Sequence, residues 1–497
     1  DEGYWRVDQT SASVLKCFVR GVCLGGSNTS TQCAEGQTGP YCSVCEDGYS
    51  QNQNGRCYSC DSGSSVVAEG IATALFLVSL AVVAVALKYR KRLVKWYNQA
   101  VAKASKISAN RKFHTLRVKV KIVVAFCQIV SELGPSLSLV FPGNYSAYVA
   151  YYSLLQLNVI ALPNVSCIVS TNYYDQLLVN TLAPPIVFIA VAVAIQLLAV
   201  RARRLNERNP SYTQHRARRD TINAAFVISY FVLVNVSTKI FQVFQCETFD
   251  DGRSYLVADY SISCDAPERN AYLTYGSLMI LVYPVGIPLV YAVVLFQNRK
   301  RINPDWRKVV DVEEKKFVSN RVIQKEKIKV RNTYEEIENI KLLFDSYVPK
   351  RWYFELFDCA RRLLLGAVPV LIFRGSTLQI IIVLLISLCS VATFMYFNPY
   401  IHVHDNHLAI LAQWSITLVL ISALIIKVQA LSTEGGSGDS GMGAVLILLN
   451  ITIVAVAIGT TLMNSKEKKS EGGGDGDEED EERGEGEDSG RKKEDED

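Results

Sequence analysis

Apolar stretches separated by charged segments set the pattern of hydrophobic and polar positions along this chain. Most stretches are roughly 20 residues long, the length that an α-helix needs to cross the hydrocarbon of a bilayer. Charged residues are confined to the gaps, which is typical of a membrane protein. The pattern therefore predicts an all-α polytopic membrane protein with about nine transmembrane helices, at residues 66–87, 122–141, 177–200, 221–243, 272–296, 359–373, 378–397, 408–428 and 444–463.

Basic residues between the stretches indicate the orientation. Residues 88–121 are rich in lysine and arginine and are therefore expected on the cytoplasmic side. The stretch at 145–168 is apolar enough to cross, but a crossing there would place the basic residues 201–219 outside. We therefore interpret residues 142–176 as an exoplasmic interfacial or re-entrant segment. The N-terminus is then outside and the C-terminus inside.

The stretch at 272–296 is interrupted by Pro284, Gly286 and Pro288. Proline removes a helical hydrogen bond, so this span must be broken. Broken backbone at membrane depth is tolerated where protein or a water-lined cavity satisfies the freed carbonyls. We therefore expect a hinge at these three residues and a helix that faces the interior of the bundle.

Charge is distributed unevenly. The chain carries +4 in total, but residues 471–497 hold 15 acidic and 4 basic residues, which leaves +15 on the remainder. A tail with so many acidic residues and so few apolar ones is expected to be disordered. The predicted organisation is a cysteine-rich exoplasmic module (1–65), a first membrane bundle of five spans (66–297) with exoplasmic segments at 142–176 and 244–270, a charged cytoplasmic helical linker (298–350), a second bundle of four spans (351–464) and a cytoplasmic tail (465–497).

Seven of the 13 cysteines lie before residue 61, in a segment rich in glycine. So small a segment cannot bury enough apolar surface to fold alone and needs cross-links. Two interpretations stay open: disulfides, favoured by an extracellular location, or a zinc ion held by the pairs Cys42/Cys45 and Cys57/Cys60. The exoplasmic cysteines number ten, which suggests that Cys246 pairs with Cys264 and that Cys167 takes the leftover module cysteine. The disulfide candidates are Cys17, Cys23, Cys33, Cys42, Cys45, Cys57, Cys60, Cys167, Cys246 and Cys264.

Asn-x-Ser sequons on the predicted exoplasmic side indicate a glycoprotein. The candidate acceptors are Asn28, Asn144 and Asn164.

The second predicted span contains the most polar stretch of any span. An ionisable residue at such depth indicates an ion pathway or a paired structural charge. For Glu132 both alternatives are open, and the structural one pairs it with Lys239 of the fourth span. The candidate pathway residues are Gln128, Ser131, Glu132, Pro135 and Lys239.

Another charged group lies where the sixth span enters from the cytoplasm. Asp358 and Arg362 are spaced i, i+4 with the acid first, which is the favourable order on a helix. One interpretation is a simple anchor at the inner interface. The other is a site for membrane lipids, phosphoinositides in particular, that biases a gate. The candidate residues are Glu355, Asp358, Arg361 and Arg362.

Metal and catalytic sites have little support. Asp250, Asp251, Asp259 and Asp265 crowd the loop before the broken span without the spacing of a calcium loop. His402, His404, Asp405 and His407 lie close together, but in a short loop with nothing to orient ligands. No nucleophile elbow, phosphate loop or HExxH pattern occurs, so we expect no enzyme activity, no metal site and no cofactor, apart from Ca²⁺ as a permeant or exoplasmic ion.

Residues 36–49 show the GxxGxxCxxCxxGY pattern of an EGF-like or laminin-type module. Four further motifs accompany it: the Cys-bounded loop ending at Cys264, the Tyr283–Pro288 helix, the residues from Trp352 to Leu363, and Phe397-Asn-Pro-Tyr400. Together these motifs resemble those of the TRP-like (polycystin-related) membrane proteins of protists, algae and oomycetes.

The resemblance implies a cation channel or channel-like sensor in the plasma membrane, with a homo-oligomer as one expected state and no nucleic-acid partner. The chain departs from a typical TRP channel because residues 432–441, between its last two spans, form a linker without a pore helix. A lipid scramblase or transporter, and an adhesion or receptor protein without transport, are the alternatives.

Overall fold

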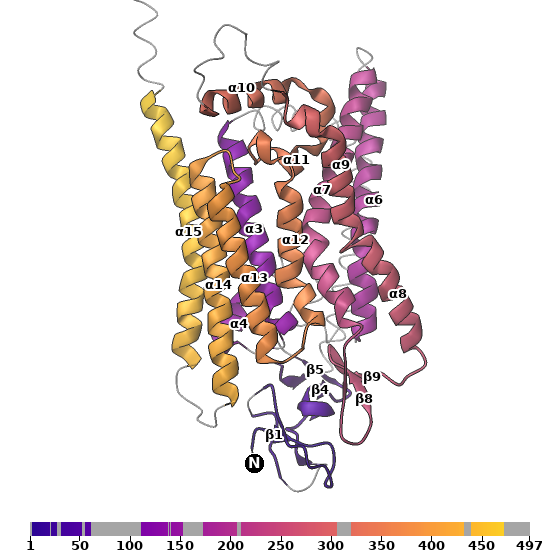
Figure 1. The fold of residues 1–497 in the computed structure, drawn as a ribbon. Helices are drawn as coiled ribbons and strands as arrows, with labels where there is room; N and C mark the ends of the chain where they lie inside the picture. Colours follow the sequence, from indigo (N-terminus) through magenta and orange to yellow (C-terminus); the bar gives the residue numbers. More distant parts are fainter. Residues whose placement is uncertain are drawn as a thin grey trace, which may run out of the picture.

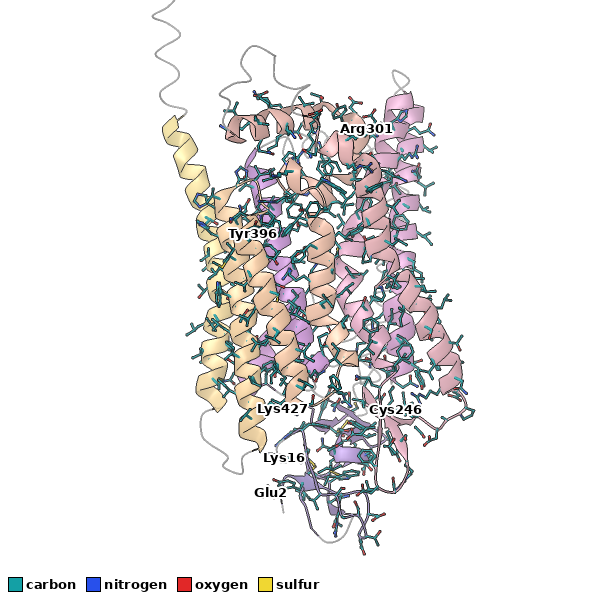
Figure 2. All side chains as sticks on the ribbon, in the orientation of Figure 1. Glu2, Lys16, Cys246, Arg301, Tyr396 and Lys427 are labelled. Carbon is teal, nitrogen blue, oxygen red and sulfur yellow. A yellow bond between two sulfur atoms is a disulfide. The ribbon has the colours of Figure 1, made fainter. Side chains whose placement is uncertain are left out.

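A computed structural model describes residues 2–19, 21–26, 31–51, 55–60, 111–137, 139, 141–152, 172–205, 210–305, 320–431 and 439–471. Long helices run side by side and form a bundle, and the cysteine-rich module lies at one end of it (Figure 1). Short helices cover the opposite end. Arg301 lies at that opposite end, whereas Cys246 and Lys427 lie next to the module (Figure 2).

Within the described residues, seven helical segments are long and apolar enough to cross a membrane. They belong to helices α3 (Arg111–Leu137), α6 (Tyr173–Leu205), α7 (Pro210–Gln242), α8 and α9 together (Arg269–Val282 and Gly286–Ile302), α13 (Thr377–Phe397), α14 (Val403–Leu431) and α15 (Asp439–Glu471). Helix α15 continues eight residues past the predicted end of the last span at 463, into the predicted tail. By their length and composition, these seven segments indicate a membrane-embedded protein.

The remaining two predicted spans have different outcomes. Residues 66–87 lie outside the described residues. The span predicted at 359–373 is instead helix α12 (Phe354–Gly366), which has 13 residues and continues into the short 3-10 helix η8 (Val368–Leu371). Helix α12 lies in the middle of the bundle, between α3 and α13 on one side and α7 and α9 on the other (Figure 1). Most of its surface therefore packs against protein, although Ala360 and Leu364 lie exposed on one side.

The broken helix is kinked where predicted, but the prediction that it faces the interior is wrong. Leu281, Leu289 and Phe296 are 64%, 59% and 57% exposed, so this segment lies on the outside of the bundle. The backbone at the kink is satisfied locally, because the amide of Val285 donates to the carbonyl of Ile280 at 3.2 Å. A neighbouring wet cavity is thus not needed, and an aliphatic outer face suits lipid.

Gly286 is required by the kink itself. A Cβ atom at this position would lie 2.6 Å from the carbonyl oxygen of Leu281.

The module consists of three small two-stranded sheets. They pair β1 (Tyr4–Trp5) with β2 (Leu15–Lys16), β3 (Gln37–Thr38) with β4 (Val44–Cys45), and β5 (Tyr49–Gln51) with β6 (Cys57–Ser59). Disulfides join Cys17 to Cys23, Cys33 to Cys42 and Cys45 to Cys57, and Cys60 is also disulfide-bonded. These bonds exclude the zinc interpretation, because the sulfurs of Cys42, Cys45, Cys57 and Cys60 are all used.

A three-stranded antiparallel sheet connects α7 to α8 and meets the module. Its strands are β7 (Cys246–Thr248), β8 (Ser254–Leu256) and β9 (Asp259–Ser263), with Cys246 paired to Leu256 and Tyr255 to Ser263. The expected bond between Cys246 and Cys264 is present. Trp5 and Tyr41 of the module form an apolar core with Phe249 and Tyr260 of the sheet.

At the end away from the module, the linker forms α10 (Asn320–Thr333), η6 (Glu335–Ile340), α11 (Lys341–Phe344) and η7 (Pro349–Arg351). This agrees with the predicted helical character of residues 298–350. Of the predicted segment 142–176, the structure describes the short helix α4 (Gly143–Ala150) and the start of α6, and residues 153–171 lie outside the described part.

Candidate functional site

Helix α12 carries a buried stripe of charge. Glu355, Asp358 and Arg362 recur at intervals of three and four residues, so they share one face of the helix. Together with Arg361, all four are less than 5% exposed. The helix packs against α3, α7, α9, α11 and α13. A narrow side that includes Ala360 and Leu364 stays exposed. The arginines expected to reach lipid headgroups at the inner interface instead point into protein.

Arg362 lies at the centre of this stripe. Its Nε lies 3.1 Å from Oδ2 of Asp358, and its NH1 donates to Oε1 of Gln128 at 3.1 Å. The guanidinium also lies 4.1 Å from the ring centroid of Tyr230, in cation–π contact. One side chain thus holds α3, α7 and α12 together.

Arg361 points the other way around α12. Its NH2 and Nε donate to Oδ1 of Asp358 at 2.7 and 3.1 Å. Its NH1 donates to Oε1 of Gln413, on α14, at 2.9 Å. Asp358 is therefore shared by two guanidiniums, one on each of its oxygens.

Lys121 brings a third cation from α3. Its ammonium pairs with Glu355 and donates to the carbonyl of Leu342 at 3.0 Å. The hydroxyl of Tyr347 donates to the same oxygen of Glu355 at 3.0 Å. We call Lys121, Glu355, Asp358, Arg361 and Arg362 the charge network; it contains three cations and two anions.

A second buried pair lies nearby. Lys119 and Asp405 are 3.3 Å apart and each is 1% exposed, and Lys119 also donates to Thr460 of α15 at 2.7 Å. The sequence pattern indicates for Asp405 only a poorly supported place in a metal site with the neighbouring histidines. Its role here is to neutralise a lysine and fix the start of α14.

Sequence reasoning missed Lys119, Lys121 and Gln413. The two lysines were assigned to a cytoplasmic flank, because the predicted span began at residue 122. The alternation of lysine with Val118 and Val120 has a period of two, which is typical of a strand, so it did not indicate that the helix begins earlier. Helix α3 in fact starts at Arg111.

A small cavity adjoins the charge network. It has a volume of about 10 Å³, and its polar lining consists of Lys121, Tyr230, Asp358, Arg361, Tyr400 and Gln413. Such a volume holds about one water molecule.

The predicted pathway residues lie in two places. Gln128 accepts a hydrogen bond from Arg362 of the charge network, and its own amide donates to the carbonyls of Tyr230 and Phe231. Ser131 bonds to the carbonyl of Cys127 within its own helix. Glu132 is buried, beside Gly366 and one turn before Pro135. Lys239, on α7, lies over the ring of Tyr173, 6.0 Å from its centroid, and its pairing with Glu132 stays a prediction.

A second cluster joins the module to the bundle, and we call it the clasp: Tyr41, Glu247, Tyr260 and Arg374. The hydroxyls of Tyr41 and Tyr260 donate to the two oxygens of Glu247, at 2.7 and 2.5 Å. Arg374, in the turn between η8 and α13, lies 4.0 Å from the same carboxylate. Burial, followed by the bond to Glu247, holds the pKa of Tyr41 well above its usual value.

Tyr41 adopts a strained backbone to make this contact. Its φ is +56°, in the left-handed region that residues with a side chain rarely occupy. Strain of this kind persists where the surrounding structure imposes it and is concentrated at functional positions.

Possible metal ligands are otherwise engaged. Within the described residues, no three His, Cys, Asp or Glu side chains are grouped to hold a metal ion. Asp250 accepts a bond from Ser11 of the module, Asp251 pairs with Arg253, and Asp259 accepts from the amide of Tyr173. Of the glycosylation candidates, Asn144 is exposed on α4; Asn28 and Asn164, like Cys167, lie outside the described residues.

Searches of protein-family models, curated sequences and solved structures find no match to this chain. The resemblance to TRP-like proteins therefore stays a prediction, and the site rests on its own geometry.

Proposed function

We propose that this chain is a channel-like membrane sensor, in which the cysteine-rich module controls the passage of ions through the helical bundle. The observation that carries the proposal is the charge network on α12, buried among membrane-length helices. Cations, Ca²⁺ among them, are the proposed permeant ions, as the resemblance to TRP-like proteins implies.

Burial of these charges supports a functional role. Removing a charged group from water costs several kcal/mol, and an apolar core of the same shape is often at least as stable. Ionisable residues inside membrane bundles are therefore rare, and they mark ion or proton pathways in many membrane proteins. Helix α12 carries four of them within eight residues.

Contacts beyond the C-terminal end of α12 support the sensing role. Arg374 follows η8 by three residues, and η8 follows directly from α12. A change in the clasp would therefore act on the helix that bears the charge network. We place the module outside the plasma membrane, because its disulfides require an oxidising compartment.

The proposed route differs from the one expected from sequence. We assign it to the region around α3, α7 and α12, which holds Gln128 and Glu132, and not to the outward-facing kink of α8 and α9. The hinge residues keep a structural role in this proposal.

Reconstitution into liposomes tests the proposal. We expect purified full-length protein to release trapped Na⁺, K⁺ or Ca²⁺, and Asp358→Asn to change the rate or the selectivity at least several-fold. Asp265→Asn, the same change at an exposed loop position, is the control and should leave the flux unchanged. Flux equal to that of protein-free liposomes would overturn the channel proposal. Bleaching of inner-leaflet lipid by dithionite would indicate a scramblase instead.

A receptor without transport is the second candidate. Two observations favour it: the broken helix faces outward, and the cavity beside the charge network has room for only about one water molecule. This candidate predicts neither ion flux nor lipid exchange. It predicts that a ligand binds to the full-length protein on the side of the module that faces away from the bundle. Membrane lipids and a second copy of the chain are further proposed partners of either form.

A further inference from the structure

The cavity beside the charge network is a built site. Its six polar lining residues come from α3, α7, α12, α14 and the turn before α14, and each is less than 10% exposed. Helices hold five of them, and the backbone of Tyr400, in the turn, is fixed by hydrogen bonds with the side chain of Asn406.

The electrostatics of this site favour an anion. The charge network has three cations and two anions, a net charge of +1. The second pair, Lys119 with Asp405, is neutral and leaves this balance unchanged. A buried excess charge is unfavourable unless a counter-charge approaches it.

The hydrogen-bond donors and acceptors around the cavity also favour an anion. Lys121 and Arg361 contribute an ammonium and a guanidinium, which have donors only. The carboxylate of Asp358 also lines the cavity, but its two oxygens are already engaged by Arg361 and Arg362. A cation entering this cavity would meet a net positive charge, so the proposed cation route does not run through the cavity itself.

The size of the cavity restricts the anion. About 10 Å³ is the space of one water molecule, so a single-atom anion fits and a phosphate, sulfate or carboxylate does not. We propose that the cavity binds a halide, chloride under ordinary conditions, as a structural counter-ion of Lys121 and Arg361. The anion stabilises the packing of α3, α12 and α14 and is not itself transported.

Thermal unfolding of the full-length protein in detergent tests this inference. We expect the apparent melting temperature to be about 2 °C or more higher in sodium chloride than in sodium gluconate at equal ionic strength, and to saturate with chloride. Bromide should replace chloride, and sulfate should not. Equal melting temperatures in all four salts would mean that the cavity holds only water, and would overturn the inference.

The variant Gln413→Glu locates the effect. The introduced carboxylate can still accept the bond from Arg361, and it brings the net charge of the site to zero. We expect this variant to lose the chloride dependence and to be at least as stable in gluconate as the wild type. Gln297→Glu, the same change at an exposed position of α9, should keep the chloride dependence of the wild type. A Gln413→Glu protein with the full chloride response would place the anion elsewhere and overturn the assignment.

Discussion

The hydroxyl of Tyr283 lies 2.5 Å from the carbonyl oxygen of Thr181. This carbonyl lacks its helical partner because residue 185 is proline, which has no amide hydrogen to donate. The kinked helix and the proline-bearing helix α6 therefore satisfy each other at the outside of the bundle. Thr181 also bonds through its own hydroxyl to Tyr275, at 2.6 Å.

Removing this hydroxyl should weaken the contact between the two helices. We expect Tyr283→Phe to cost about 1–3 kcal/mol, because a buried carbonyl loses its donor. Tyr272→Phe is the matched control, since Tyr272 contributes a ring stacked 3.8 Å from that of Tyr174 and keeps it. Apparent melting temperatures in detergent measure both. If Tyr283→Phe lowers the melting temperature no more than Tyr272→Phe does, the hydroxyl of Tyr283 contributes nothing and the residue acts through its ring.

Lys121 and Glu355 should show strong coupling. Each of Lys121→Met and Glu355→Gln is expected to cost about 3 kcal/mol or more, because each leaves a buried charge without its partner. The double variant should cost less than the sum, and this difference is read from a double-mutant cycle of unfolding free energies.

The exposed pair Lys341 and Glu338 is the control for this cycle. Its members are 3.4 Å apart but about one-third exposed, so the coupling should be below about 1 kcal/mol. Comparable coupling in both pairs would contradict the importance of burial.

The clasp should determine how firmly the module is attached. Glu247→Gln removes the charge that attracts Arg374 and leaves one acceptor for two tyrosines. We expect faster amide hydrogen exchange in residues 37–45 and 254–263, with exchange in α13 and α14 unchanged. Glu46→Gln, at an exposed position of the module, should have no such effect. Unchanged exchange in Glu247→Gln would mean that the apolar core alone attaches the module.

Attachment of the module should also depend on pH. The pKa of Tyr260, like that of Tyr41, is raised by burial and by the negative charge of Glu247. The attached state therefore binds these protons more tightly than the detached state. Its stabilisation is fully present below about pH 10, the usual pKa of tyrosine, and is lost as the pH rises further.

Acid should act through Asp250. Hydrogen bonds from Ser11 and Ser13 lower the pKa of Asp250, so its contribution is present above about pH 4 and is lost as the pH falls through the lowered value. Amide hydrogen exchange of the module, measured at several pH values, follows both the alkaline and the acid loss of attachment. Tyr41→Phe should weaken the alkaline transition and leave the acid one in place.

Local signals made some elements predictable almost to the residue. Helix α13 was expected at 378–397 and spans Thr377–Phe397. Ser376 caps its start by accepting from the amide of Gln379, and Asn398 ends it with a left-handed φ of +43° just before Pro399. Such signals lie within a few residues of the element they set.

The charge network could not be predicted in this way. Glu355 and Lys121 are 234 residues apart, and periodicity along one helix does not identify a partner on another. The prolines of the fifth span predicted a kink but not the direction in which it faces. The leucines and valines on both sides of the kink were the available signal that this helix has an apolar outer face.

The charged face of helix α12 is buried, and its charges are bonded to three different neighbours, α3, α7 and α14. A gradual tilt of such an element would break several ion pairs before new ones could form, so intermediate positions are costly. Any rearrangement of this protein should therefore proceed as a jump between a few discrete packings, with α12 exchanging one complete set of partners for another.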